Sequence, residues 1–525
     1  MTTLRFQPEA ERYYAAGYWR SGDLWSDFAA CAEANPDKVA LILDERQVTY
    51  DGLRRAAEGV SARLADGKVE PGDVVVLLGR HSIEAAVALL GCLHRGVVLA
   101  PLPPMFNETQ LAALIAQTGA TAVVGFGGDK EIAKCHAVAE HVRLPLILTP
   151  DTVDELATGE WSGDRVGRDA DDLAMVLHSS GTTSAPKGIA HSSNTLRYAT
   201  EGVCRRWELT GEDVYLVVCE FGFVGGLVFG YFPPLLNGAT GVLVNRWKAD
   251  DALRLIEQHR CTYVLAMPTH SADLLQAAQE TSYDLSSMRA LAAPGLTRDR
   301  RMAMKHAFGV PPLADYGLSE VPGHAAHGLD EPDAKTVKTE GRPYEGTEIR
   351  IVDDDERPLP TGEVGSVIVN GPSRFLGFFN NDALTRESLT VWGGYRTGDL
   401  GCLDEDGHFV YVGRSKDIIR RGGVTVLPAE LEPVILRHPA VREVAVVPLP
   451  DDRLGERACA AIIPTPGHAV PTLAELQRFL AAEGVAKYTW PESVEAFDEF
   501  PRTPSLKVVK RDVVQQVQER SAITA

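Results

Sequence analysis

Short apolar runs alternate with amphipathic stretches along residues 73–150, and this alternation restricts the possible folds more than any other feature of the chain. The apolar runs read DVVVLLG, GVVLAPL, ATAVVGF and LPLILTP. Two stretches between them, SIEAAVALLGCLHRG and ETQLAALIAQTG, have the apolar spacing of helices. Strands and helices that alternate in this way build a mainly parallel sheet covered by helices. The sequence therefore predicts an α/β fold.

The same pattern returns between residues 213 and 316, where the apolar runs DVYLVVC, TGVLVN and CTYVLAM alternate with the helix-like stretches ADDALRLIEQH (249–259) and HSADLLQAAQE. This predicts a second doubly wound sheet. From about 346 to 412 short alternating strands are separated by Gly, Pro and Asp, a texture typical of a small antiparallel barrel-like subdomain. Two helices and two strands follow residue 414. We expect a large N-terminal domain over 1–414 and a small, mobile α+β domain over 415–525.

Charge and cysteine usage exclude several classes of protein. The 525 residues carry a formal net charge of -20, whereas nucleic-acid backbones and anionic membranes require a basic face. The eight cysteines show no C-x-x-C spacing, so neither a disulfide framework nor a zinc site is indicated. No run of about 18 apolar residues occurs. We expect a cytoplasmic protein without nucleic-acid or membrane partners.

Residues 178–188 read HSSGTTSAPKG and follow the apolar run DDLAMVL. Glycines let the backbone wrap closely round a ligand, and the hydroxyls are hydrogen-bond donors suited to phosphate oxygens. The stretch is not the G-x-x-x-x-G-K-[ST] phosphate loop, because Lys187 precedes the last glycine. Alone, it is also compatible with a solvated strand-to-helix turn.

Three later stretches help to interpret this loop. They are YGLSE at 316–320, YRTGDL at 395–400 and GRSKDIIRRGG at 413–423. In this order and at these intervals the four motifs resemble the adenylate-forming superfamily, which includes acyl- and aryl-CoA synthetases, nonribosomal peptide adenylation domains and luciferases. The resemblance extends over almost the whole chain. The segment AERYYAAGYWR near the start resembles the aryl-acid-activating branch.

The resemblance implies an ATP-dependent ligase that forms AMP. Such enzymes join a carboxylate to the α-phosphorus of ATP, expel pyrophosphate, and then pass the acyl group to a thiol. Both reactants of the first step are anions, so the site must neutralise charge and hold them in line. We expect an aryl or small carboxylic acid as substrate, ATP with Mg²⁺, CoA as co-substrate, a role in secondary metabolism, and a monomer or homodimer.

The resemblance also assigns nucleotide-binding roles. Tyr316 would lie against the adenine in a set that includes Ser319. Asp399 would accept from the ribose hydroxyls, and Arg414 would be the second ribose or phosphate contact. Glu320 and Thr182 would hold Mg²⁺. The mobile loop over the β- and γ-phosphates would consist of Ser179, Ser180, Gly181, Thr182, Thr183 and Lys187.

Catalysis and domain movement are assigned to the last part of the chain. Lys507 would be the cation that faces the carboxylate and the α-phosphate, and Glu320 would share the catalytic role through the metal. Lys416 would be the hinge about which the small domain swings between the two half-reactions. Gly422 and Gly423 would line the approach of the thiol, unless they form a simple hairpin turn.

Substrate choice is assigned to a pocket that departs from the family pattern. The pocket would contain Phe223, Gly225, Pro294 and Gly295. Phe223 stands where CoA ligases often have a histidine, Glu220 stands near the usual proline, and LAAPGLT replaces the common G-G-A turn. A buried aromatic side chain is otherwise more often part of a core.

Further departures leave two alternatives open. Ser184 and Leu506 each replace a family glycine, and Thr425 stands where asparagine is frequent. Together with Phe223 and Glu220, Leu506 is also compatible with a relative that does not use CoA: one that loads a carrier protein, or a diazotase that activates nitrite, another planar anion, for an aryl amine. Ser184 and Leu506 alone are compatible with a nucleotide-binding pseudoenzyme.

Overall fold

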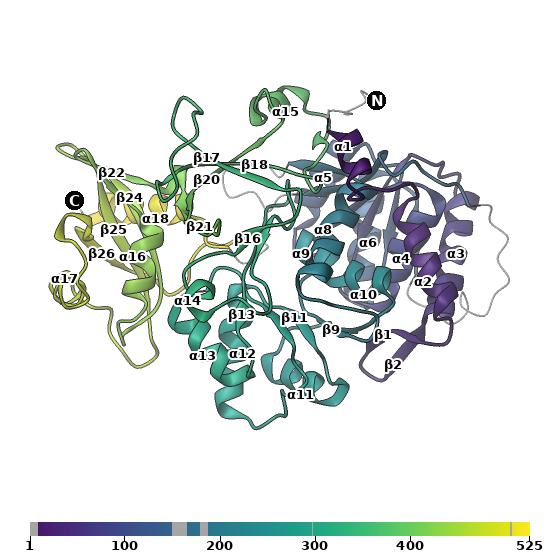
Figure 1. Cartoon of the computed structure of the whole chain (residues 1–525), viewed down its shortest axis with the longest axis horizontal. Coiled ribbons are helices and arrows are strands. Elements are labelled where there is room, and N and C mark those ends of the chain that lie inside the picture. The colour runs from purple at the N-terminus through teal and green to yellow at the C-terminus, as the bar shows by residue number, and fades with distance from the viewer. Residues whose placement is uncertain (1–8, 150–164, 179–186, 297, 504–506, 525) are drawn as a thin grey trace. The chain divides into compact units, whose positions relative to one another are not determined.

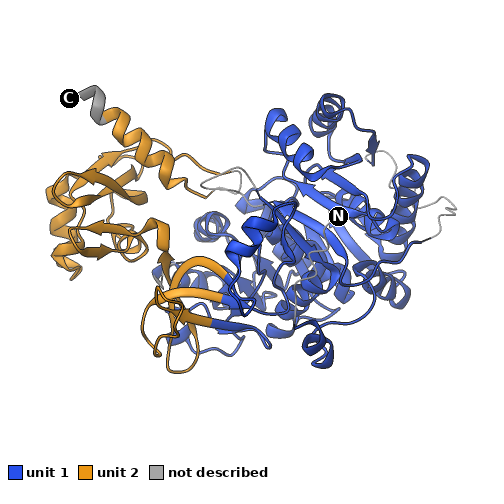
Figure 2. Cartoon of the chain, turned by 90° about the horizontal axis from the view of Figure 1, so that it is seen from above, with its two compact units in different colours: residues 1–179, 186–349, 369–395 blue, residues 180–185, 350–368, 396–525 orange. Residues whose placement is uncertain are grey.

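A computed structural model describes residues 9–149, 165–178, 187–296, 298–503 and 507–524 (Figure 1). The described residues form two compact units (Figure 2). The larger one contains the residues up to 178, together with 187–349 and 369–395, and the smaller one contains 350–368 and the residues from 396 onward. No helix among the described residues has both the length and the apolar character needed to cross a bilayer. The predicted boundary between 414 and 415 stays a prediction.

The first sheet of the larger unit has the strand order β19-β8-β7-β4-β3-β5-β6. Its parallel part contains β3 (Val74–Leu78), β4 (Val98–Leu102), β5 (Ala122–Gly125) and β6 (Leu146–Leu148), all of which were predicted from their apolar runs. Strands β3 and β4 are buried along their whole length, as strands of a sheet covered on both faces are. The predicted helices are α4 (Ile83–Arg95) and α5 (Glu108–Thr118).

One edge of this sheet is antiparallel. Strand β7 (Leu173–His178) pairs with β8 (Gly188–Ser192), and β8 pairs with β19 (Gly377–Phe378). The last pair of the β7–β8 ladder joins His178 to Gly188. The hydroxyl-rich stretch therefore connects two antiparallel strands, whereas the sequence alone was also compatible with a strand-to-helix turn.

The second sheet has the order β13-β12-β11-β9-β10-β1-β2. Its strands are β1 (Val39–Leu43), β2 (Arg46–Thr49), β9 (Val214–Val217), β10 (Thr240–Leu243), β11 (Tyr263–Leu265), β12 (Ala290–Ala292) and β13 (Pro312–Leu313). Every neighbouring pair is parallel except β1–β2. The helices α11 (Ala249–His259) and α12 (Pro268–Glu280) lie between its strands in the sequence, as predicted.

The region predicted as a barrel-like subdomain forms a four-stranded sheet in the order β17-β18-β20-β21. Its strands are β17 (Glu348–Val352), β18 (Gly365–Asn370), β20 (Tyr395–Leu403) and β21 (Phe409–Arg414). Strands β20 and β21 form an antiparallel hairpin that places Asp399 opposite Arg414. The two motifs that resemblance links to the ribose thus meet across one ladder.

The rest of the smaller unit is a five-stranded sheet with helices on both faces. Its strands are β22 (Ile419–Arg421), β23 (Val424–Val426), β24 (Val441–Asp451), β25 (Gly455–Pro464) and β26 (Ser493–Ala496). Alternate residues of β24 enter different cores: Val446 packs with α16 (Pro428–Ile435) and α17 (Leu473–Ala482), whereas Val447 packs with α18 (Lys510–Thr524). This arrangement agrees with the predicted α+β domain.

Candidate active site

Three segments predicted to bind ligands leave the same edge of the second sheet. Strand β9 leads into the segment with Phe223 and Gly225, β12 leads to Pro294 and Gly295, and β13 leads to Tyr316. The strands β13, β12, β11 and β9 are parallel neighbours. Parallel strands end at a common edge, which is where open α/β sheets bind ligands. The fold of the larger unit therefore collects these segments.

Side-chain contacts support this placement of the pocket residues. A Cβ added to Gly225 would lie 3.7 Å from the Leu265 side chain at the end of β11, and one added to Gly295 would lie 3.5 Å from Pro268. Gly225 and Gly295 thus lie beside consecutive parts of the chain that leaves β11. Phe223 is partly exposed, and the chain after it forms a π-helical turn, Leu227–Tyr231, a feature frequent at functional sites.

The strand that follows the hydroxyl-rich stretch is linked to the YGLSE turn. A ring nitrogen of His191 on β8 lies 2.8 Å from the Ser319 carbonyl oxygen. The backbone N–H of Phe375, next to β19, donates to the Glu320 carbonyl oxygen at 2.8 Å. The Lys187 ammonium lies 5.2 Å from the centre of the Phe378 ring on β19. The other residues of the predicted phosphate loop lie outside the described residues: Ser179, Ser180, Gly181, Thr182 and Thr183.

Sequence reasoning missed one residue of this turn, His324. Its ring packs edge-on against Tyr316 with the ring centres 4.6 Å apart. Burial lowers the pKa of His324 to about 4, so the ring is neutral, and its Nδ1 donates to the Val321 carbonyl oxygen at 2.8 Å. His324 therefore orients the face of Tyr316. No sequence signal identified it, because a histidine four residues after a motif has no characteristic pattern.

In the smaller unit, the two residues predicted to contact ribose form an ion pair. The Arg414 Nε lies 2.8 Å from the Asp399 Oδ1. The Asp399 side chain is 2% exposed, whereas that of Arg414 is 36% exposed. The Thr397 hydroxyl accepts from the Asp399 backbone N–H at 3.0 Å, which fixes the turn. The pair presents a carboxylate with its cation, as the recognition of a polyhydroxyl ligand requires.

The remaining predicted residues of the smaller unit lie on turns. Lys416 lies in a 3₁₀ turn, Ser415–Asp417, directly after β21. Gly422 and Gly423 connect β22 to β23 with φ angles of 55° and 85°, so they do form a hairpin turn. Lys507 is exposed, and its carbonyl oxygen accepts from the Thr503 N–H at 2.8 Å.

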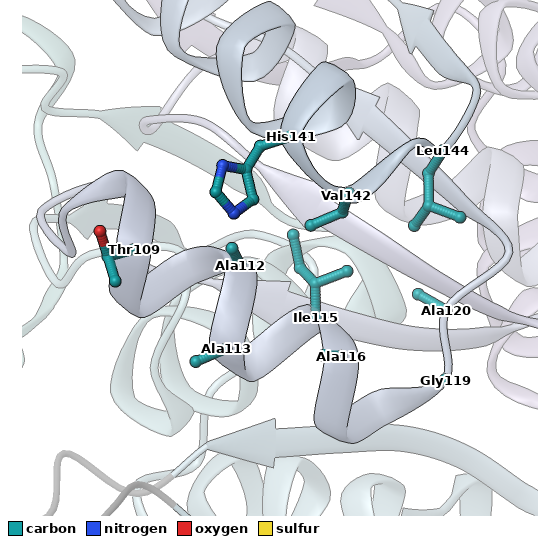
Figure 3. Close-up of a pocket in the computed structure, with 10 residues that line it drawn as sticks. All are labelled: Thr109, Ala112, Ala113, Ile115, Ala116, Gly119, Ala120, His141, Val142 and Leu144. Atoms are coloured by element: carbon teal, nitrogen blue, oxygen red, sulfur yellow. The ribbon is translucent and has the colours of Figure 1, made fainter.

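Two other features of the structure do not belong to this site. An open groove of about 460 Å³ lies between α5 and α6 (Asp129–Val142), lined mostly by small and apolar side chains such as Ile115 and Val142 (Figure 3). No lysine or arginine is among the described residues that line it, so it offers no positive charge to a nucleotide.

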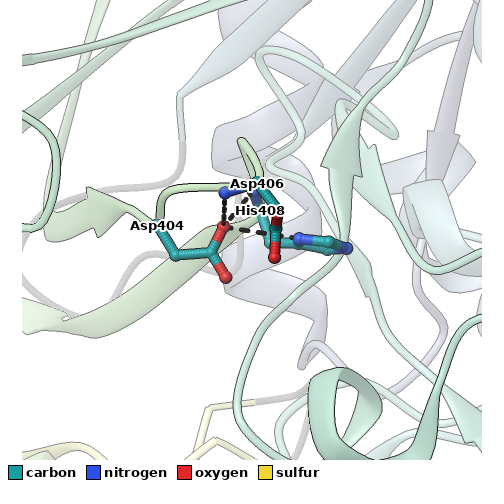
Figure 4. A group of neighbouring side chains, drawn as sticks. All are labelled: Asp404, Asp406 and His408. Carbon is teal, nitrogen blue, oxygen red and sulfur yellow. Dashed lines mark hydrogen bonds and ion pairs between the residues drawn. The ribbon is translucent and has the colours of Figure 1, made fainter.

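The second feature is a group formed by Asp404, Asp406 and His408 in the turn between β20 and β21 (Figure 4). The Asp404 Oδ1 accepts from the backbone N–H of Asp406 at 3.0 Å and of His408 at 2.9 Å. These bonds close the hairpin turn. The group is therefore explained by the local fold.

Comparison with known proteins gives the same assignment over the whole chain. The family model for AMP-binding enzymes matches residues 28–379, and the model for the AMP-binding enzyme C-terminal domain matches residues 430–507. The chain is 32% identical to the medium-chain fatty-acid–CoA ligase of Escherichia coli K12, with 97% of this chain and 93% of that protein covered. It is 31% identical to a salicylyl-CoA synthase/salicylate adenylyltransferase of a Streptomyces species, with 96% of each covered.

Among solved structures, ATP-bound MatB from Rhodopseudomonas palustris superposes with a TM-score of 0.87 at 25% identity, over 95% of this chain and 99% of that one. These matches agree with the resemblance that the motifs indicate. The chain belongs to the AMP-binding enzyme family within the adenylate-forming superfamily, and it is an ATP-dependent, AMP-forming ligase of the acyl- and aryl-CoA ligase type.

Proposed function

We propose that this ligase activates an aryl carboxylic acid and transfers it to CoA. The observation that carries the proposal is the common edge of β9, β11 and β12, where Gly225 lies beside Leu265, Gly295 lies beside Pro268, and the ring of Phe223 is partly exposed. Flat aromatic substrates gain both apolar burial and ring contacts against such a surface. The salicylyl-CoA synthase relative, similar over the whole chain, supports the same class of acid.

In the first half-reaction the acid carboxylate attacks the α-phosphorus of ATP and pyrophosphate leaves. The chain must neutralise two approaching anions, and Lys507 supplies the cation for the attacking carboxylate and the α-phosphate. Lys187 and the hydroxyls of residues 179–183 contact the β- and γ-phosphates. Asp399 accepts from the ribose hydroxyls, and Arg414 holds that carboxylate in place at 2.8 Å.

Mg²⁺ suits the residues of the YGLSE turn. Glu320 carries an oxygen ligand of the type that Mg²⁺ prefers. Hydrogen bonds from the Phe375 N–H to the Glu320 carbonyl oxygen and from the His191 ring to the Ser319 carbonyl oxygen fix the turn on which it lies. When bound, the ion would shield the charge of the phosphates. Glu320→Gln should therefore raise the Mg²⁺ concentration required for pyrophosphate exchange, measured by titrating the metal at fixed ATP.

The second half-reaction needs the face that Lys507 occupied to open for a thiol. Lys416 is the hinge of this movement, and the Gly422–Gly423 turn lines the approach of the pantetheine arm of CoA. A turn without side chains leaves room for a narrow chain. The protein acts in the cytoplasm, where CoA and ATP are available, and it acts without nucleic-acid or membrane partners.

One panel of reactions tests the proposal. Pyrophosphate release is measured with aryl acids, fatty acids and nitrite, each with and without CoA. We expect release with aryl acids and acyl-CoA formation when CoA is added. Release only with nitrite plus an aminoaryl acid would instead identify a diazotase, and acyl-AMP that transfers to a carrier protein but not to CoA would identify a carrier-loading ligase. No ATP turnover with any acceptor would identify a pseudoenzyme.

A further inference from the structure

The carboxyl group of Glu220 lies at the pocket edge without a hydrogen-bond partner for one of its oxygens. Among the residues that the structure describes, no donor reaches the buried Glu220 Oε2. An unsatisfied buried polar atom costs about 1–3 kcal/mol, more for a charged group. Proteins rarely keep such atoms unless a ligand, a water molecule or an ion pairs with them. The unpaired Oε2 of Glu220 therefore requires an explanation.

The polar groups that surround Glu220 have partners of their own. Burial raises the pKa of its carboxyl group; Arg80 acts in the opposite direction and Glu131 in the same one. The Arg80 Nε already donates to the Glu131 carboxylate at 2.7 Å. The Tyr231 hydroxyl donates to the Ser82 carbonyl oxygen and accepts from the Ser82 N–H, both at 3.1 Å. The thiol of Cys219 faces the Leu265 carbonyl oxygen at 3.5 Å.

The backbone at Glu220 is held firmly, so the point from which its side chain starts is fixed. A Cβ added to Gly226 would lie 2.1 Å from the Glu220 carbonyl oxygen, so only glycine permits the chain to fold back over this residue. A ring nitrogen of the buried His81 contacts the carbonyl oxygen of Cys219, the preceding residue. Preorganisation of this kind is typical of residues that meet a ligand.

Position and charge together restrict what this ligand group is. Glu220 starts the segment that carries Phe223 and Gly225, at the edge where the acid is proposed to bind. The reacting carboxylate of the substrate cannot be its partner, because two carboxylates repel one another. The partner must be a hydrogen-bond donor elsewhere on the same molecule. Amino and hydroxyl groups on an aromatic ring are such donors.

We propose that Glu220 determines substrate specificity by accepting a hydrogen bond from an amino or hydroxyl substituent on the ring of the aryl acid. This inference rests on the proposed aryl-acid function and narrows it to acids with a hydrogen-donating ring group. An acid that lacks the donor leaves the buried oxygen unpaired, and sites built in this way discriminate strongly against such analogues.

The test compares benzoate with its ortho, meta and para amino and hydroxy derivatives in acid-dependent ATP–pyrophosphate exchange. In the wild-type enzyme we expect at least one amino or hydroxy acid to exceed benzoate in kcat/KM by about 10- to 100-fold, the range that one hydrogen bond to a charged group supplies. The comparison of amino with hydroxy derivatives shows which donor is recognised. Glu220→Leu should remove this preference, mainly through a higher KM for the preferred acid. The kcat/KM for benzoate should stay the same or increase.

Two controls separate recognition from a structural role. Glu220→Gln keeps an accepting oxygen and should retain part of the preference. Glu84 is a buried carboxylate that already pairs with Arg46 at 2.5 Å, so Glu84→Gln should lower the melting temperature without changing the order of substrates. The melting temperature of Glu220→Leu should fall less than that of Glu84→Gln, because the Glu220 Oε2 has no donor among the described residues to lose.

The outcomes distinguish the two proposals. Equal kcat/KM for benzoate and all its derivatives in the wild-type enzyme would overturn the role of Glu220 and leave the aryl-acid function standing. A Glu220→Leu variant that loses activity equally with every acid and melts at a lower temperature than Glu84→Gln would also overturn it. Exchange with fatty acids but with no aryl acid would overturn both proposals.

Discussion

Lys507 and Lys510 lie three residues apart near the end of the chain, and Lys510 has a structural task. The Lys510 ammonium lies 2.6 Å from the Glu432 carboxylate, which ties the start of α18 to α16. Lys507 is exposed and precedes this helix. The sequence motif pointed to Lys507 although the surrounding basic residues gave no reason to prefer it, and the pairing of Lys510 agrees with that choice.

Replacing Lys507 by alanine should therefore separate the two half-reactions. Because a cation is needed while two anions approach, acid-dependent pyrophosphate exchange should fall by about 100-fold or more. CoA transfer from supplied acyl-AMP should change by no more than a few-fold. Lys510→Ala should lower the melting temperature and retain exchange. Equal losses in both half-reactions of Lys507→Ala would contradict the assigned role.

Asp315 precedes the predicted adenine residue Tyr316, and it gives the protein a pH-dependent stability. Burial raises the pKa of its carboxyl group to about 7; the Tyr344 hydroxyl, which donates to it at 3.2 Å, and then Arg206 act in the opposite direction. The ordinary pKa is 3.8. Asp315 therefore leaves the free energy of unfolding unchanged below pH 4. As the pH rises to 7, the ionisation of this carboxyl group lowers that free energy by at most about 4 kcal/mol.

Asp315→Asn should remove this penalty, since the amide keeps an acceptor for Tyr344 and does not ionise. We expect the variant to gain melting temperature over the wild type at pH 8 and to gain little or nothing at pH 5, measured by thermal denaturation at both values. A variant that is destabilised equally at the two pH values would show that the carboxylate is not held in an unfavourable ionised state.

At the scale of elements, hydrophobic patterning predicted those parts whose partners are near in sequence. The runs at β3, β4, β5 and β9 became strands, and the stretch at 249–259 became α11 with the same bounds. The contact of β1 with β10 was not predicted, because Leu41 and Gly241 are far apart in the chain and no local pattern encodes such a pairing. The same reason applies to the addition of β19 to β8.

The β22–β23 hairpin is an element whose turn has two interpretations, a local fold and a passage for the thiol. A Cβ added to Gly423 would meet no atom within 4 Å, so Gly423→Ala costs only the strain of a positive φ, about 1 kcal/mol. Gly423→Phe has the same backbone cost but adds bulk. If the thiol passes this turn, Phe should slow CoA transfer about tenfold or more relative to Ala, while pyrophosphate exchange stays equal in the two variants. Equal CoA transfer would leave the turn with its local role only.

At the scale of the whole molecule, the sequence predicted the superfamily and both regions of α/β and α+β structure, and the matches to residues 28–379 and 430–507 confirm the family. The sequence motifs could predict which residues belong to the candidate site, but not how those residues are arranged in space. The Asp399–Arg414 pair and the link from His191 to Ser319 arise from ladders and turns that no single motif contains.

We propose that the predicted C-terminal domain, residues 415–525, changes position between the two half-reactions, and Lys416 is its predicted hinge. Lys416→Pro fixes one backbone angle, so overall turnover should fall about tenfold or more while at least one isolated half-reaction continues. Lys416→Ala keeps the backbone free and serves as the control. Unchanged overall turnover in the proline variant, measured by acyl-CoA formation, would place the hinge elsewhere.

The most direct test of the account follows the fate of ATP with an aryl acid and CoA. If the chain splits the bond between the α- and β-phosphates, AMP, pyrophosphate and acyl-CoA will appear in equal amounts, and pyrophosphate will exchange into ATP without CoA only when the acid is present. Formation of ADP and phosphate, or AMP formation that does not depend on any acid, would contradict the account.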